Sequence, residues 1–351
     1  MDQGAVMGLR LAVVGCGGMA QLHRDALAGQ QRRFDVVAAV DPVPERAAEF
    51  AAAFRGARPV REVSEVVDDI DAALVIAPHH VHHDVGLRLL QSGRHVLMEK
   101  PLALDEQECR DLIRASGAGG GILMVAYPMR YHPLVLSLRD QVRSGVVGEV
   151  FQMSIWTEQY TRYADAHWAN RRSTVGGGQL FSHGCHYIDL LVWLLGEPVR
   201  GSHLGTRRGT EWMEGEGTSN VQIEFASGAL GYHFGTWGAR ATRLGYRIHV
   251  HGTSGLLDAD IIEGRLRLSA GGRTRTITQV NGHDKYLAHE LEHFADVIDG
   301  RAVLRTDAET ALRGLQIIWR LYEAADAGVV ADLRGLGFGD TAGSVTAGII
   351  G

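Results

Sequence analysis

In this 351-residue chain, the type and position of Lys100 indicate a possible catalytic group. It stands in Glu99-Lys100-Pro101, directly after the short apolar run 95–98 (HVLM). The proline prevents an immediate helix, so we expect an extended turn that points Lys100 away from the preceding strand. Ligands of open α/β sheets bind at that end of the strands. The alternative is a surface lysine paired with Glu99.

A second group of reactive types lies in the segment 179–195 (QLFSHGCHYIDLLVWLL), which predicts a helix with apolar anchoring. The glycines 176–178 before it predict a flexible lead. Ser182, His186 and Asp189 follow the spacing i, i+4 and i+7, which places them on one helix face. Histidine titrates near neutral pH and suits the removal of a hydroxyl proton while hydride leaves the same carbon. The alternative for His186 is a satisfied histidine of the core.

A nucleotide site is predicted near the start of the chain. The apolar run 9–14 is typical of a buried strand, a helix is expected over about 19–29, and the segment between them fits G-x-G-x-x-G/A. Gly15 would permit the tight turn, and Gly17 would let the backbone approach a pyrophosphate held at the helix N-terminus. The predicted loop consists of Gly15, Cys16, Gly17, Gly18, Met19 and Ala20.

Asp41 indicates which dinucleotide is bound. It ends the second apolar run, 34–40, about 20 residues beyond the loop, where a carboxylate accepts hydrogen bonds from the adenosine ribose hydroxyls. The same charge repels a 2′-phosphate, and Pro42 stands where an arginine would otherwise accommodate it. NAD is therefore favoured over NADP. The alternative for Asp41 is a turn or helix-capping residue before the proline.

The elements that position these residues fall into two kinds. Further strands are predicted at 72–77, 95–98 and 122–126, with helices between them, which predicts right-handed crossovers and a parallel sheet. From about residue 151 the chain shows alternating segments such as VQIEF, ALGYHF and YRIHV, which are typical of an antiparallel sheet. We predict a dinucleotide-binding domain at 1–127, an α+β domain at 128–335 and a glycine-rich tail at 336–351.

Composition excludes several functions. Lys plus Arg is 35 and Asp plus Glu is 41, a net charge of −6 without a basic run, which disfavours nucleic-acid binding. We find no apolar stretch of the roughly 18 residues that a membrane span needs, and no signal-peptide pattern. The three scattered cysteines indicate reduced thiols and a cytoplasmic location. The histidines of 79–83 lack acidic or cysteine co-ligands, so no metal is expected there.

Several blocks between residues 9 and about 333 resemble the Gfo/Idh/MocA family of nicotinamide-dependent sugar and cyclitol oxidoreductases. GCGGMA is similar to its dinucleotide loop, HVLMEKP to its most distinctive tract, and GGGQLFSHGCHYIDLLVWLLGEP to its substrate helix. Ala77-Pro78 followed by His82 is similar to the stretch ahead of that tract. The resemblance implies a Rossmann domain and a second domain with a large open, mostly antiparallel sheet. It also implies homodimers or homotetramers that pack through this sheet.

The resemblance assigns roles to individual residues. Lys100 would bond the reacting hydroxyl at the nicotinamide end of the site, and His186 would exchange its proton. We expect Pro78, His79, His82 and Glu99 on the cofactor side. Ser182 departs from the family, which has an aspartate at that position. One possibility is that His186 works with Lys100 as the sole base. Another is that His183 takes the part of the aspartate, although adjacent residues such as Ser182 and His183 point about 100° apart on a helix. A third is that the chemistry has changed.

The predicted substrate is a small polyhydroxylated molecule. Aromatic faces stack on sugar C–H surfaces and arginines bond hydroxyl groups. Candidates from the segments 127–131 and 156–172 are Tyr127, Arg130, Trp156, Trp168 and Arg171. For the tryptophans and tyrosines of 156–172 the alternative is a sheet surface buried in a dimer. We expect an NAD-dependent enzyme that oxidises a secondary hydroxyl of a sugar, glycoside or cyclitol. The alternatives are glycoside cleavage through transient oxidation and elimination, and a sensor without net chemistry.

Overall fold

The computed structural model describes residues 8–282 and 284–337, which form two compact units. The first contains residues up to Tyr131, Thr174–Gly176 and Tyr286–Leu312. The second contains His132–Ser173, Gly177–Lys285 and the residues from Arg313 onward. These units are not contiguous in sequence, and the domain limits at 127 and 335 stay a prediction. Of the predicted tail, residues 338–351 lie outside the described residues.

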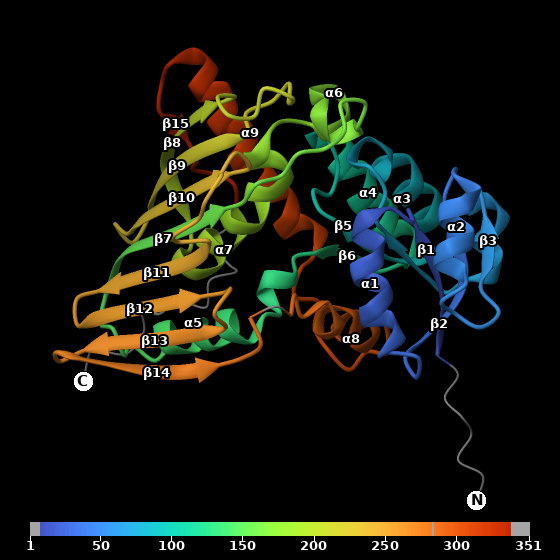
Figure 1. Cartoon of the computed structure of the whole chain (residues 1–351), viewed down its shortest axis with the longest axis horizontal. Helices are drawn as coiled ribbons and strands as arrows, with labels where there is room; N and C mark the ends of the chain where they lie inside the picture. Colours follow the sequence, from blue (N-terminus) through green and yellow to red (C-terminus); the bar gives the residue numbers. More distant parts are fainter. Residues whose placement is uncertain (1–7, 283, 338–351) are drawn as a thin grey trace, which may run out of the picture. The chain divides into compact units, whose positions relative to one another are not determined.

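The first unit is built on a parallel sheet, as predicted (Figure 1). Its described strands, in spatial order, are β3 (Arg58–Val60), β2 (Phe34–Val40), β1 (Leu9–Val14), β4 (Ala72–Val75), β5 (His95–Glu99) and β6 (Leu123–Ala126). The strand order reverses between β1 and β4, which is the switch point where ligands of such sheets bind. β3 was not predicted, because three residues with a central proline carry no periodicity.

Helices connect these strands. They are α1 (Gly18–Ala28), α2 (Pro44–Ala51), α3 (His82–Gln91) and α4 (Glu106–Gly119), and the later helix α8 (Leu287–Ile298) also belongs to this unit. Local signals define their ends. Pro44 stands in the first turn of α2, and the Asp105 side chain caps α4 by accepting a hydrogen bond from Glu108 N at 2.9 Å. α4 ends at Gly120, which adopts the left-handed conformation that favours glycine.

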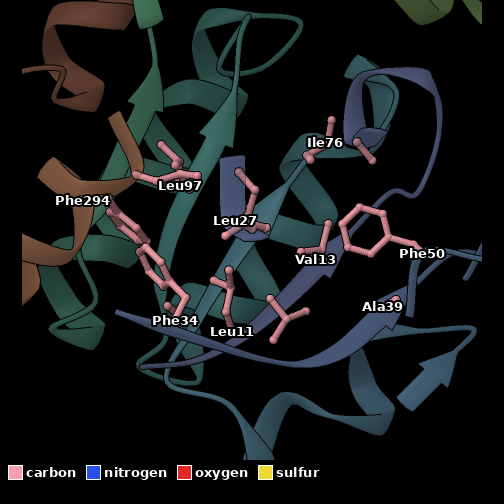
Figure 2. Packing of buried hydrophobic residues seen from close by; sticks show 14 of the residues in the cluster. Leu11, Val13, Leu27, Phe34, Ala39, Phe50, Ile76, Leu97 and Phe294 are labelled. Carbon is pink, nitrogen blue, oxygen red and sulfur yellow. The ribbon is translucent and has the colours of Figure 1, made fainter. Parts of the chain in front are cut away.

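The core of the first unit joins segments far apart in the sequence (Figure 2). Leu11 of β1, Phe34 of β2 and Leu97 of β5 belong to one buried cluster with Phe294 of α8. Arg33 reinforces this packing through an ion pair with Asp296 at 2.9 Å. The late helix α8 is therefore part of the nucleotide-binding unit, although the 160 residues 127–286 separate it from β6.

The second unit holds a large open sheet that is mostly antiparallel, as predicted. Its described strands, in spatial order, are β14 (Arg273–Gln279), β13 (Arg265–Ala270), β12 (Gly255–Asp260), β11 (Tyr246–Gly252), β7 (Val150–Glu158), β10 (Leu230–Thr236), β9 (Thr218–Phe225), β8 (Pro198–Thr206) and β15 (Ala331–Asp332). β7 and β10 run parallel, and the other described pairs in this sheet are antiparallel.

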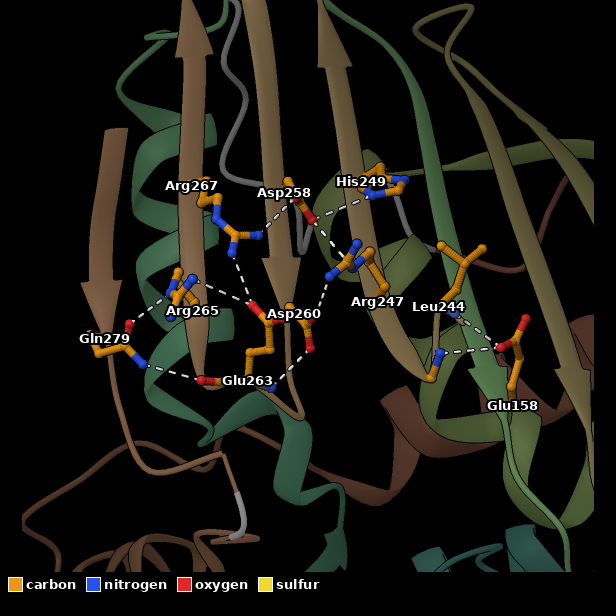
Figure 3. Close-up of polar contacts among 11 residues, drawn as sticks. Glu158, Leu244, Arg247, His249, Asp258, Asp260, Glu263, Arg265, Arg267 and Gln279 are labelled. Carbon is orange, nitrogen blue, oxygen red and sulfur yellow. Dashed lines mark hydrogen bonds and ion pairs between the residues drawn. The ribbon is translucent and has the colours of Figure 1, made fainter. Parts of the chain in front are cut away.

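Alternation gives this sheet two different faces. Helices α5 (Pro133–Arg143), α7 (Cys185–Leu195) and α9 (Ala308–Ala327) cover the face that carries buried residues such as Ile155, Ile223 and Leu257. The opposite face carries ion pairs across β11, β12 and β13, among them Arg267 to Asp258 at 3.5 Å (Figure 3). We call this the outer face of the sheet.

Short helices complete the described chain. They are 3₁₀ helices at Val63–Glu65, Val67–Asp69, His79–Val81, Pro128–Arg130 and Trp168–Asn170, the α-helical turn α6 (Arg172–Val175), and a π-helix at Leu180–Gly184. The uniform helix predicted over 179–195 is wrong in its first turn, because this π-helix precedes α7. Within residues 8–282 and 284–337, no helix combines the length and apolar character that a bilayer crossing requires.

Candidate active site

The glycine loop between β1 and α1 has two glycines with different physical roles. Gly15 has φ +92°, and a Cβ there would lie 2.6 Å from the Ile76 carbonyl oxygen, so the fold itself requires glycine. A Cβ at Gly17 would meet nothing within 4 Å. The loop therefore leaves open space beside the N-terminus of α1, which suits a pyrophosphate.

Asp41 follows β2 and holds this loop. Its two carboxylate oxygens accept hydrogen bonds from the backbone N–H groups of Cys16 and Val43, each at 2.9 Å. The predicted ribose-binding residue thus also acts as the turn residue that was its alternative. Burial and then the Asp41 charge raise the pKa of Cys16 to about 12, so this thiol stays protonated at neutral pH.

The ends of β4 and β5 are joined by buried histidines. His82 has Nδ1 2.9 Å from the Pro101 carbonyl oxygen and Nε2 2.9 Å from that of Ala77. Two carbonyl acceptors favour the doubly protonated ring, but burial opposes its charge more strongly and lowers the pKa of His82. His79 places Nδ1 2.9 Å from the Val175 carbonyl oxygen. His82 therefore holds the turn that contains Lys100 against the turn after β4.

Glu99 faces the interior, and Lys100 beside it is half-buried. The Glu99 carboxylate accepts a hydrogen bond from His23 Nε2 at 3.0 Å and one from the Lys100 backbone N–H at 3.2 Å. Burial raises the pKa of Glu99, but His23 and the Lys100 charge outweigh it and the net shift is downward. Glu99 is therefore an ionised buried carboxylate at the base of the Lys100 turn.

A second carboxyl group, Glu290 on α8, was missed by the sequence reasoning. It is fully buried, and burial together with the Glu99 charge raises its pKa well above the usual value. The signal was present in the sequence, because Glu290 shares the face of α8 that carries Leu287, Leu291 and Phe294. An acidic residue on an apolar helix face indicates a buried, protonated carboxyl group.

In the second unit, a polar clamp holds the start of the segment that carries the predicted catalytic histidine. The Tyr322 hydroxyl accepts hydrogen bonds from the N–H groups of Gly178 at 3.3 Å and Phe181 at 3.2 Å, and donates to Glu216 Oε1 at 2.6 Å. Glu216 Oε1 also accepts from Leu180 N at 3.1 Å. These bonds satisfy N–H groups that a helix start leaves without intrahelical partners.

The glycines before this segment are tightly packed. A Cβ at Gly178 would collide with the Glu216 side chain, and one at Gly177 would lie 2.7 Å from Phe181 Cβ. The expectation of a flexible lead is therefore wrong for Gly177 and Gly178. These glycines serve close approach to Glu216 and Phe181.

The π-helix changes how the predicted catalytic residues are arranged. α-Helical spacing does not hold across Leu180–Gly184, which contains Ser182, because the wider turn shifts the phase of the helix before α7 begins. Ser182 and Asp189 are buried, whereas His183 and His186 are half-buried with ring centroids 6.0 Å apart. His183 and His186 are three residues apart, a spacing that makes side chains neighbours on a helix, and their rings are in edge-to-face contact.

The predicted substrate residues occupy different environments. Trp156 packs against Tyr232 and Phe234, with ring centroids 5.3 and 5.4 Å away, on the outer face of the sheet. α7, which carries His186, covers the other face, so the structure does not bring these two residues together. Trp168 is half-buried and Arg171 is exposed. Tyr127 and Arg130 are buried in the first unit, where Arg130 donates to the Arg305 carbonyl oxygen at 3.1 Å.

Comparisons with known proteins agree with this architecture. The family model described as "Oxidoreductase family, NAD-binding Rossmann fold" matches residues 9–127, and "GFO/IDH/MocA C-terminal domain" matches residues 135–258. The fold and the glycine loop thus define an NAD-binding oxidoreductase of two domains. The chain belongs to the Gfo/Idh/MocA family, as the sequence motifs indicated, and its NAD-binding Rossmann domain is confirmed.

Individual relatives are distant. The chain is 27% identical to scyllo-inositol 2-dehydrogenase (NAD(+)) of Bacillus subtilis (strain 168), over 87% of this chain and 90% of the relative. It is 26% identical to 2,7-anhydro-N-acetylneuraminate hydratase of Escherichia coli (strain K12), over 65% of this chain and 59% of the relative. Some other curated relatives are also matched over part of their length, for example 62%. Levoglucosan dehydrogenase in complex with NADH and L-sorbose has the same fold, with a TM-score of 0.84, 20% identity and coverage of 93% and 99% of the two chains.

Proposed function

We propose that this protein is an NAD-dependent oxidoreductase that transfers hydride between nicotinamide and a secondary hydroxyl or ketone of a sugar, glycoside or cyclitol. The observation that carries the proposal is the loop 15–20 in a chain of this family. Open space beside Gly17 suits a pyrophosphate, and the ionisable Asp41 side chain lies at the end of β2. The negative charge of Asp41 disfavours the 2′-phosphate of NADP.

The chemistry divides between the cofactor and the chain's own residues. NAD, when bound, supplies the hydride acceptor. We assign to the Lys100 ammonium a hydrogen bond to the substrate oxygen, which stabilises the negative charge that develops there. Glu99 and His82 support this role, because they hold the turn that carries Lys100. His186 takes the hydroxyl proton in the oxidation direction and returns it in reduction.

The test is absorbance at 340 nm with purified protein, excess NAD and a panel of inositols, aldoses, amino sugars and glycosides. A steady rise with one class of compound is expected, and Lys100→Met should lower the rate at least about a hundredfold. Arg114→Ala, an exposed change on α4, serves as the control and should leave the rate unchanged. A Lys100→Met enzyme with the same rate would contradict the assigned role of Lys100.

A second function uses the same groups without net oxidation. The enzyme would oxidise a ring hydroxyl, eliminate a substituent next to the acidified C–H, and return the hydride. Two observations favour it: Ser182 stands where the family has an aspartate, and one relative is named a hydratase. Cleavage of a glycoside with no net rise at 340 nm would support this reaction over the first. Neither rise nor cleavage, with NAD and a sugar still binding, would support a sensor.

We also propose that copies of the chain associate through the outer face of the sheet as homodimers or homotetramers, in the cytoplasm. The aromatic group of Trp156, Tyr232 and Phe234 beside a set of ion pairs supports this, since such mixed surfaces are typical of subunit interfaces. The three cysteines are free and buried, as expected in a reducing compartment. Trp156→Glu should shift the mass measured by light scattering toward the monomer.

A further inference from the structure

A chain of hydrogen bonds surrounds the His183 ring in the second unit. Its Nε2 lies 3.4 Å from the Tyr246 hydroxyl, and its Nδ1 lies 3.3 Å from Gln179 Nε2. The Tyr246 hydroxyl in turn donates to Gln159 Oε1. Both ring nitrogens of His183 thus have polar neighbours from β11 and from the turn before the π-helix.

The donor and acceptor types determine where the His183 proton lies. The Tyr246 hydroxyl gives its hydrogen to Gln159, so its oxygen can only accept from His183. Nε2 must therefore carry the hydrogen. With the Gln179 amide oriented so that its nitrogen faces the ring, its N–H groups donate and Nδ1 is the unprotonated nitrogen. Burial raises the pKa of Tyr246 to about 12, which keeps this hydroxyl protonated.

The Gln179 amide is held in place by packing. Its side chain is fully buried, and a Cβ at Gly235 of β10 would overlap the amide group. Gly235 therefore provides the space in which Gln179 reaches His183. If Nδ1 were protonated, its N–H would face the N–H of the Gln179 amide, and neither group could accept a hydrogen bond. This environment therefore favours a neutral His183 ring.

The fixed His183 ring touches the ring that we assign as the base. The His183 and His186 centroids are 6.0 Å apart with an interplanar angle of 83°. Tyr187 and Trp237 contact the same His183 ring, with centroids 5.3 and 6.4 Å away. His183 is thus held by two hydrogen bonds and by packing, and its edge-to-face contact restricts the plane of His186.

We propose that Gln179, Tyr246 and Gln159 hold His183 as a neutral ring protonated on Nε2, and that His183 is the positioning residue for His186. This proposal rests on the proposed function of His186 as proton acceptor. A carboxylate one turn before a catalytic histidine would both orient that ring and raise its basicity. Here the neutral His183 ring orients His186 without adding a charge, so Ser182 does not need to take over the role of the carboxylate.

The first test reads the tautomer directly and needs no substrate. Protein labelled with ¹⁵N-histidine is examined by long-range ¹H–¹⁵N correlation NMR, and His183→Phe assigns the signals. We expect His183 to show a protonated Nε2 and an unprotonated Nδ1 at neutral pH. Tyr246→Phe should move the two nitrogen signals toward each other, because the acceptor that selects the tautomer is gone. Tyr232→Phe, a matched change on the outer face, should leave them in place.

The second test separates positioning from folding. With a substrate from the panel, Tyr246→Phe and Gln179→Met should each lower kcat about tenfold while KM changes less than about twofold, as expected when a base is present but loosely oriented. His183 protonated on Nδ1, or a tautomer unaffected by Tyr246→Phe, would overturn the proposal. If no compound in the panel is oxidised, the proposed function fails, but the tautomer result still decides the hydrogen-bond arrangement.

Discussion

Glu99 and Glu290 are two buried carboxyl groups of the first unit, and the charge of Glu99 acts on Glu290. Glu99 is ionised because His23 and Lys100 compensate its burial. For Glu290, burial and the Glu99 charge outweigh a backbone hydrogen bond at Tyr127 and raise its pKa well above the usual value. Two glutamates that lie near each other therefore differ in protonation, Glu99 being ionised and Glu290 protonated, because the neighbours of each carboxyl group differ.

Replacing Glu290 with glutamine should stabilise the protein at neutral pH. In the unfolded chain this carboxyl ionises above about pH 4.3. In the folded protein it stays protonated to a higher pH, so the free energy of unfolding falls as pH rises above that value. Glutamine cannot ionise and removes this loss. Urea unfolding should show Glu290→Gln above wild type at pH 7, with a smaller difference at pH 4.

The control for this prediction lies on the same helix. Glu292 is exposed, so Glu292→Gln should change the free energy of unfolding by less than about 0.5 kcal/mol at either pH. A Glu290→Gln variant less stable than wild type at pH 7 would show that Glu290 is ionised in the folded protein.

At the scale of elements, the two glycines of the loop between β1 and α1 should affect different properties, Gly15 the stability of the fold and Gly17 the binding of NAD. Gly15→Ala should cost about 2 kcal/mol or more in unfolding free energy, because φ +92° and the nearby Ile76 carbonyl both oppose a Cβ. Gly17→Ala should leave stability within about 0.5 kcal/mol, since its Cβ meets open space. It should weaken NAD binding at least about tenfold in calorimetry, because the methyl group enters the pyrophosphate space. Equal NAD affinity in Gly17→Ala would place the pyrophosphate elsewhere.

The clamp on the π-helix can be tested in the same way. Tyr322→Phe removes the acceptor of two N–H groups and the donor to the buried Glu216 carboxyl. We expect a loss of about 2–3 kcal/mol in unfolding free energy, because buried polar groups are left without these partners. Tyr160→Phe, at a half-exposed tyrosine, should cost less than about 0.5 kcal/mol. Similar losses of unfolding free energy in Tyr322→Phe and Tyr160→Phe would mean that the hydrogen bonds of Tyr322 contribute little to stability.

For the whole molecule, buried histidines should make stability depend on pH. Burial lowers the pKa of His203 and of His233 to about 4, and also lowers the pKa of His79 and His82. Their unfolded forms bind protons below about pH 6.5, whereas the folded forms resist protonation. The unfolded state then binds more protons, so the free energy of unfolding should fall as pH drops from 7 toward 4. Equal stability at pH 7 and pH 5 in urea unfolding of the Glu290→Gln variant, which lacks the opposing contribution of Glu290, would contradict this.

The sequence by itself determined the parallel sheet, the glycine loop, the mostly antiparallel second sheet and the family. These depend on local patterns: apolar runs, alternation, and short motifs whose residues adjoin in the chain. It also indicated Lys100 and Asp41 as candidate site residues, because both follow the end of a predicted strand.

The tertiary structure alone decided the surroundings of these residues. Glu290 lies near Glu99 because α8 returns to the first unit, and Tyr246 reaches His183 because β11 lies two strands from β10. The π-helix at Leu180–Gly184 changed the phase between Ser182 and His186 from the α-helical expectation. Contacts between segments so far apart in the chain produce no recognisable periodicity or spacing in the sequence. The environment that sets the protonation of a residue could therefore be seen only in the folded structure.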